Sequence, residues 1–207
     1  MSEVNYKSNN IRYLVPLAFI IGIVPLIVFA KKISISGILK AYWSQELDFF
    51  SYYKMVAFLA ATLLVMVALI IYYIKYRQIK KTYYYLLIEA YGILIIISTI
   101  YSTVPSVALW GFPDRYEGVL VLLGYLIILV ATINLVNYEL DIKFLLAVLF
   151  ISATLISIIG ILQYFGVDLL TTVFGKRLIL PEKLHNITDN INVRFDYGFS
   201  TLYNPNY

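Results

Sequence analysis

Residues 55–74 read MVAFLAATLLVMVALIIYYI, an apolar run without a charged side chain. A helix of about 20 residues is about 30 Å long, which matches the hydrocarbon core of a bilayer. The next seven residues, 75–81, contain four Lys or Arg residues and no acid. Dense positive charge beside an apolar run is typical of the cytoplasmic end of a transmembrane helix. The stretch therefore predicts a membrane helix that ends in the cytoplasm.

The rest of the chain has the same character. Of 207 residues, 61% are hydrophobic and 14% are charged, and the mean hydropathy is +0.83, whereas soluble domains carry roughly 25% charged residues. The composition predicts an all-α, polytopic membrane helix bundle in the cell membrane. We expect about five spans, at residues 13–30, 55–74, 83–104, 119–137 and 144–165.

Polar segments separate these runs. Residues 1–10 are expected to be disordered, residues 138–143 to form a short link, and residues 166–207 to form an outward-facing tail. The tail ends in STLYNPNY, which predicts a turn because Asn-Pro favours turn initiation. In residues 144–165, Ser152, Thr154, Ser157 and Gly160 are small residues at near-helical spacing, typical of helix packing.

The orientation follows from the basic cluster at residues 75–81. Five spans with a cytoplasmic N-terminus place this cluster inside, and residues 106–118 and the tail outside. The full count opposes this choice, with seven Lys and Arg inside and nine outside. We keep it because the inside charges are dense and close to the spans, while those outside are spread over long loops with acids.

Composition also excludes several kinds of site. The chain has no cysteine and one histidine, His185, so we expect no metal site, no thiol chemistry and no cofactor. The net charge of +4 is not gathered into a basic stripe, and we expect no nucleic-acid partner. Membrane lipid is the expected surrounding. His185, alone in a polar segment, is interpreted as a solvated residue.

Residues 106–118, SVALWGFPDRYEG, form a turn-rich loop between two apolar runs. Glycine, proline and aromatic residues suit a loop at a membrane boundary. Its centre is Arg115, whose permanently charged guanidinium can bind a phosphate or carboxylate. The alternative is that Arg115 only pairs with its acidic neighbours, Asp114 and Glu117.

Glu89 is a membrane-embedded acid in the predicted span 83–104. A carboxylate there costs about 2.5–3.5 kcal/mol at mid-bilayer and less near an end. One interpretation is a proton-handling or substrate-binding group that faces the bundle interior. The other is a carboxylate that reaches the cytoplasmic edge and its nearby lysines.

Four phrases occur in a recognisable order: WGFPDRYEG (110–118), ILQYFGVD (161–168), FGKRLILP (174–181) and RFDYGFSTLYNPNY (194–207). In this order they resemble the O-antigen ligase family, the Wzy/WaaL-type bacterial polysaccharide polymerases and ligases. The resemblance covers most of residues 110–207. It implies a metal-independent, inverting GT-C glycosyltransferase of the cell envelope. Such enzymes move a glycan from a polyprenyl-diphosphate carrier to an acceptor at the outer face of the membrane.

By position in these phrases, Arg115 and Arg194 are the expected ligands of the lipid diphosphate, with Lys176 and Arg177 as second choices. Family members have ten or more spans and a large late outer loop that supplies an Arg and a His. The chain is therefore expected to be the N-terminal part of such an enzyme, inactive alone, leading to a missing sixth span or working with a partner chain that supplies the missing spans. Two alternatives stay open: a small membrane transporter that uses Glu89, and a non-enzymatic membrane subunit.

Overall fold

The computed structural model describes residues 2–33, 47–113, 115–182 and 200–202, with side chains from residue 11 onward. Within these residues the chain is mostly helical, so the predicted all-α class is confirmed. The elements are, in order, α1 (Ser2–Gly22), the 3-10 turn η1 (Val24–Leu26), β1 (Lys31–Lys32), β2 (Leu47–Asp48), α2 (Tyr52–Tyr76), α3 (Tyr84–Ile100), α4 (Pro105–Trp110), α5 (Val119–Leu135), α6 (Glu139–Tyr164) and α7 (Val173–Ile179).

Two helices of the described chain, α2 and α6, are long and apolar enough to cross a bilayer. Three other apolar stretches, Ile11–Leu26, Tyr84–Ile100 and Val119–Leu135, are shorter than 18 residues. The two strands pair antiparallel, with Lys31 opposite Asp48, and form a two-stranded sheet at one end of the helices.

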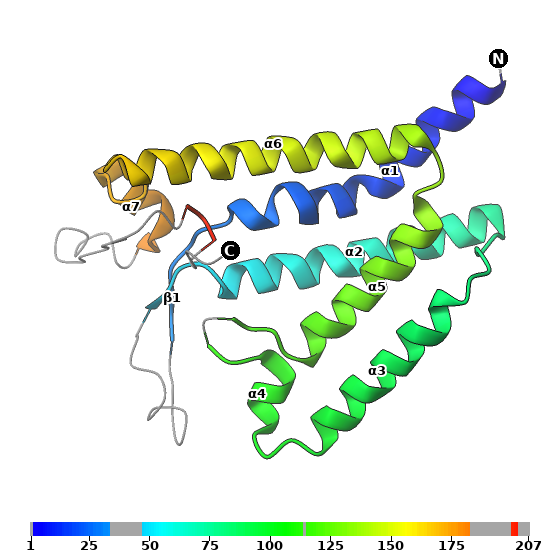
Figure 1. Ribbon diagram of the computed structural model, residues 1–207, viewed down its shortest axis with the longest axis horizontal. Coiled ribbons are helices and arrows are strands. Elements are labelled where there is room, and N and C mark those ends of the chain that lie inside the picture. The colour runs from blue at the N-terminus through cyan, green and yellow to red at the C-terminus, as the bar shows by residue number, and fades with distance from the viewer. Residues whose placement is uncertain (1, 34–46, 114, 183–199, 203–207) are drawn as a thin grey trace.

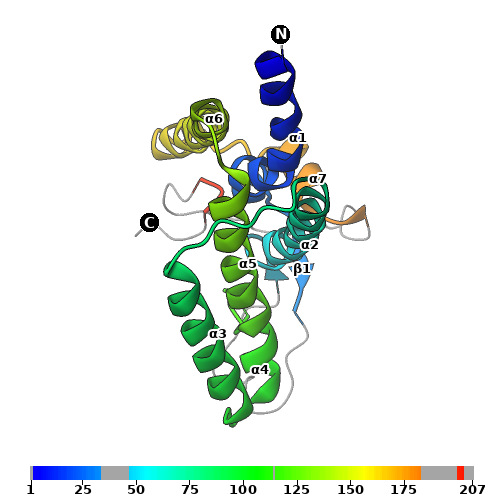
Figure 2. The same cartoon turned by 90° about the vertical axis from the view of Figure 1, so that its right-hand side faces the viewer.

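The long helices lie in a row, in the order α6, α1, α2, α5 and α3 (Figure 1; Figure 2). α1 packs between α6 and α2, α2 packs between α1 and α5, and α3 lies along α5. α1 and α2 run in opposite directions, since Tyr13 meets Tyr72 at one end of the pair and Val24 meets Met55 at the other. The direction of the long helices continues to alternate along the chain (Figure 1). The row therefore has two ends. We call the end with η1, α4 and α7 the loop end, and the end with residues 75–81 the basic end.

The core lies between the three central helices. Leu14 of α1, Val65 of α2 and Leu135 of α5 are fully buried in one cluster, together with Ala68 and Ala131. Alanines at these positions let the helix backbones come close. The helices at the edges of the row contribute little to this core: Ile95 is the one buried residue of α3, and α6 buries Asp141 and Ser152.

The first helix differs from its predicted bounds at both ends. Residues 2–10, expected to be disordered, continue α1, and the helix ends at Gly22 rather than near residue 30. Pro25 lacks a backbone donor and restricts the residue before it, so the chain tightens into η1 and then extends. The extended residues bond elsewhere: Phe29 N donates to Phe49 O at 2.8 Å, and Ala30 N donates to Ile179 O at 2.7 Å.

Two further segments differ from the expectation of loops. The predicted link 138–143 is wrong, because α6 already begins at Glu139. The Asp141 carboxylate accepts from the backbone N of Asn137 and of Tyr138, both at 3.0 Å, and so fixes this start. In the predicted loop 106–118, the first part is α4, which begins at Pro105. Proline is favoured at the first position of a helix, where no donor is needed.

Candidate functional site

The remainder of the predicted loop is a tight structure closed at its neck. Gly111 has φ +89°, and a side chain on it would collide with the backbone of Tyr116 and Glu117. A side chain on Gly118 would collide with the backbone of Gly111 and Leu109. Because the two ends of the loop touch, only glycine fits at these positions. Residues 111–118 therefore form a compact projection that carries Arg115 at the loop end.

An aromatic contact holds this projection against α2. The rings of Tyr116 and Tyr52 meet edge to face, with centroids 5.5 Å apart. Lys31 Nζ lies 4.7 Å from the Tyr52 ring centroid. Tyr116 has a positive φ of 51°, and its N–H donates to Phe112 O at 2.9 Å. This edge-to-face contact therefore fixes the position of the projection and of Arg115 on it.

Arg115 lines a cavity of about 360 Å³ between the starts of α2 and α5. The same cavity is lined by Lys54, by Glu117 and by the rings of Tyr116 and Tyr125. Within the described residues, neither cation forms a salt bridge within 4.0 Å. The predicted pairing of Arg115 with Glu117 is therefore not formed, and Asp114 lies outside the described residues. The cavity, which we call the cationic cavity, brings two positive charges together.

Lys54 lies in the first turn of α2, and its surroundings hold it in place. Its ammonium donates to the Thr201 carbonyl and lies 5.9 Å from the centroid of the Phe50 ring. The neighbouring acid, Asp48, is 5% exposed and already accepts from the N–H groups of Phe50, Ser51 and Tyr52, at 2.6 to 3.0 Å. Asp48 therefore stabilises the N-terminus of α2.

The end of the described chain closes one side of the cationic cavity. Ser200–Leu202 is a turn, whereas the Asn-Pro pair on which the predicted turn depends lies outside the described residues. Thr201 Oγ1 donates to Pro25 O at 2.8 Å, and Ser200 Oγ donates to Ile156 O at 2.6 Å. Leu202 lines the cavity. The turn thus links α6, η1 and Lys54.

Of the other predicted diphosphate ligands, the structure describes Lys176 and Arg177. Arg194, like His185, lies outside the described residues. Lys176 and Arg177 are on α7, which also lies at the loop end, but neither lines the cationic cavity. α7 itself is fixed by Ile179 and Leu180, which pack on Ala30.

Glu89 lies at the other end of the row. It is exposed on α3 and lines a separate cavity of about 320 Å³. The buried polar group in that cavity is Asn134, whose Nδ2 donates to the Tyr85 hydroxyl at 2.7 Å and whose Oδ1 accepts from Lys80 N at 3.0 Å. Asn134 therefore ties α5 to the link before α3 and to α3 itself.

The cationic cavity has the chemistry of an anion-binding site. Two positive side chains face one space beside aromatic rings, and the described residues hold no group of three His, Asp or Glu side chains that could bind a metal ion. Lys54 was missed by the sequence analysis, because it lies just before the predicted span 55–74 and belongs to none of the motifs considered there. Only the packing of α5 against α2 brings it beside the loop of Arg115.

Comparison of the chain with family models, with curated proteins and with solved structures found no match.

Proposed function

We propose that this protein is a polytopic membrane protein whose cationic cavity binds the diphosphate head of a polyprenyl-linked glycan. The observation that carries the proposal is that Lys54 and Arg115 line one cavity without a salt bridge to a described acid. We propose further that the protein serves as the N-terminal part of an O-antigen ligase-like glycosyltransferase. That part of the proposal comes from the resemblance of its sequence phrases.

The electrostatics support an anionic ligand. A guanidinium stays charged and can donate two parallel hydrogen bonds to a phosphate, and an ammonium adds a mobile point charge. Cations placed at a leaving diphosphate would also stabilise the charge that develops as the glycosidic bond breaks. Glu117 at the rim leaves the three charged side chains of the cavity with a net charge of +1.

The arrangement of the row supports the membrane part of the proposal. Helices that follow one another run in opposite directions, as expected when each crosses the bilayer in turn. The outer surfaces of α3 and α6 are apolar, with Leu86, Leu87, Phe150 and Ile151 all more than 60% exposed. Lipid, or the spans of a partner chain, would cover these surfaces. We propose the orientation in which the loop end faces the cell exterior and the basic end faces the cytoplasm.

Binding tests the site directly. The protein is reconstituted in nanodiscs and titrated with a polyprenyl diphosphate and with the polyprenol of the same length. Charge-assisted hydrogen bonds contribute about 1.5–3 kcal/mol, so Arg115→Ala and Lys54→Ala should each weaken diphosphate binding by roughly tenfold or more. Lys143→Ala, which removes an exposed cation on α6, is the matched control. Equal affinity for the polyprenol, or an unchanged affinity in both cavity variants, would contradict the site.

Transfer is tested separately from binding. In cells that make the surface glycan with this protein, Arg115→Ala should lower glycan transfer while Lys143→Ala leaves it unchanged. Intact transfer with weakened binding would remove the enzymatic part of the proposal and keep the lipid site.

A non-enzymatic membrane subunit is the second candidate, favoured by the uncovered apolar surfaces of α3 and α6. Cross-linking from these two helices to one partner chain would support it. The transporter alternative has less support, because Glu89 is exposed and lines a cavity separate from the one at the loop end.

A further inference from the structure

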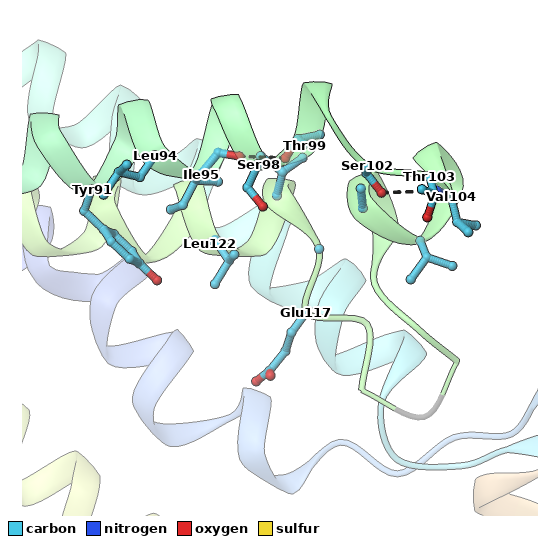
Figure 3. Close-up of a pocket in the computed structure, with 14 residues that line it drawn as sticks. Tyr91, Leu94, Ile95, Ser98, Thr99, Ser102, Thr103, Val104, Glu117 and Leu122 are labelled. Atoms are coloured by element: carbon cyan, nitrogen blue, oxygen red, sulfur yellow. Dashed lines mark hydrogen bonds between the residues drawn. The ribbon is translucent and has the colours of Figure 1, made fainter.

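A second cavity at the loop end has a different chemistry. It has a volume of about 640 Å³ and lies between α3, α4 and the start of α5 (Figure 3). We call it the α3–α5 cavity. Glu117 is the one charged side chain among its described lining residues, and none of them is a cation. An anionic head group therefore finds no favourable partner here, in contrast to the cationic cavity.

The α3 wall of this cavity changes character along the helix. Tyr91, Leu94 and Ile95 line its inner part, and Ser98 and Thr99 follow one turn later on the same face. Ser102 and Thr103 continue the hydroxyl row beyond the helix. Figure 3 shows Leu94 and Ile95 toward one end of this wall and the Ser and Thr hydroxyls toward the other, with the Tyr91 hydroxyl at the first end and Val104 at the second. The Ser and Thr hydroxyls are therefore concentrated toward the loop end of a cavity whose lining is otherwise largely apolar.

Part of the hydroxyl row is available to a ligand. Thr99 Oγ1 donates to Ile95 O at 2.8 Å, and Ser102 Oγ accepts from Val104 N at 3.3 Å. Ser98 and Thr103 form no hydrogen bond with another described residue. In Figure 3 the Glu117 side chain is turned away from Ser102 and Thr103.

We infer that the α3–α5 cavity binds a neutral, hydroxyl-bearing amphiphile. Its polyol head lies at Ser98 and Thr103, and its chain lies along Ile95 and Leu122. Free hydroxyls both donate to and accept from a polyol, while they offer no charge to an ionic head. The order of apolar and polar lining matches an amphiphile in the outer leaflet, with its head at the surface. The site shares Glu117 with the cationic cavity but has otherwise different lining residues, and it rests on the proposed membrane orientation but not on glycan transfer.

A photoreactive alkyl glucoside tests the site without any enzymatic assay. The protein in phosphatidylcholine nanodiscs is labelled through a diazirine on the chain, and the labelled residues are mapped by mass spectrometry. Labels should lie within residues 91–122. Octyl glucoside should compete at least fivefold better than octyl sulfate or octyltrimethylammonium, which share its chain. Equal competition by all three, or stronger competition by either charged head, would overturn the inference.

Two variants test separately how the cavity binds the alkyl chain and the head group of the ligand. Leu122→Trp fills the space and should reduce labelling at least fivefold. Ser98→Ala with Thr103→Val nearly keeps the volume and removes the free hydroxyls, and should abolish the preference for the glucoside head. Thr132→Val, an exposed threonine of α5 outside the cavity, is the control. If Leu122→Trp unfolds, the double variant still decides, since an unchanged head preference in it would contradict the site.

Discussion

α2 and α6 are nearly the same length and equally hydropathic, yet they sit in different surroundings. α2 has 25 residues and α6 has 26, and a third of the most apolar stretch of α2 is buried against 6% of that of α6. α2 lies in the middle of the row, with α1 and α5 on either side, whereas α6 lies at its edge against α1 (Figure 1). Hydropathy therefore predicts an apolar helix but not what covers it.

The two helices differ in which side chains they bury and which they expose. α2 presents Ala61, Thr62, Val65 and Ala68 at helical spacing, all of them buried, and these small residues let two neighbours approach. On α6 large side chains such as Phe150 and Ile158 point away from the row and are exposed. α6 packs along one neighbour, α1, and places Phe144 and Leu145 against the central core. Its start is also fixed by Asp141, and Gln163 near its end accepts from Ser200 N. The central helix is thus packed between two neighbours, whereas the edge helix is packed on one side only.

Matched phenylalanine substitutions give the largest expected difference. Phe58 of α2 is 7% exposed and meets the Tyr125 ring at 5.0 Å, whereas Phe150 of α6 is 67% exposed. Phe58→Ala should lower the free energy of unfolding by about 3–5 kcal/mol, because it leaves a cavity in the core. Phe150→Ala should change it by less than about 0.5 kcal/mol. Chemical denaturation of the detergent-solubilised protein measures both.

Equal losses for the two phenylalanine variants would break the comparison. A large cost for Phe150→Ala alone would mean that another chain covers α6 in solution. The same sample should then be an oligomer rather than a monomer.

The start of α6 gives the next largest effect. Asp141 is 1% exposed, and its carboxylate accepts from two backbone N–H groups. Asp141→Ala leaves these donors unpaired and should cost about 1–3 kcal/mol. Glu139→Ala, two residues earlier, removes an 80% exposed side chain paired with Lys143 and should cost about 0.5 kcal/mol or less. Asp141→Asn retains one acceptor oxygen and should recover part of the loss; no recovery would show that Asp141 acts through charge alone.

Much of the helical content follows from the sequence, because long apolar runs form helices in any apolar surrounding. α2, α3 and α5 begin within three residues of their predicted starts. The errors lie where local signals were given the wrong weight. The predicted span 13–30 runs across Pro25, which instead follows the end of α1, and Pro105, just before the predicted loop 106–118, begins a helix. Glu139 and Asp141 were taken for a polar link, although acids in a first turn favour a helix start.

The candidate site was predictable only in part. Arg115 was identified because a charged residue between glycines and aromatic rings marks an exposed loop. Lys54 is 61 positions away in sequence, and no pattern links the two. Their shared cavity depends on α5 lying beside α2, which is a matter of side-chain fit. The order of helices in the row is likewise set by small residues such as Gly124, whose meaning depends on the residue it faces.

Gly124 and Gly160 offer the smallest and most specific contrast between the centre and the edge of the row. A Cβ on Gly124 of α5 would lie 2.6 Å from Cε1 of Phe58, whereas one on Gly160 of α6 would lie at an ordinary 3.5 Å from Ser200 Cβ. Alanine in place of glycine stabilises a helix by about 0.5–1 kcal/mol, and overpacking costs about 1–3 kcal/mol. Gly160→Ala should therefore raise the free energy of unfolding slightly, and Gly124→Ala should lower it by about 1 kcal/mol.

Adding Phe58→Leu to Gly124→Ala should lower the free energy of unfolding by less than the sum of the two single changes, because the smaller side chain relieves the clash. Strict additivity, or stabilisation by both alanines, would mean that α5 and α2 are not in close contact at Gly124.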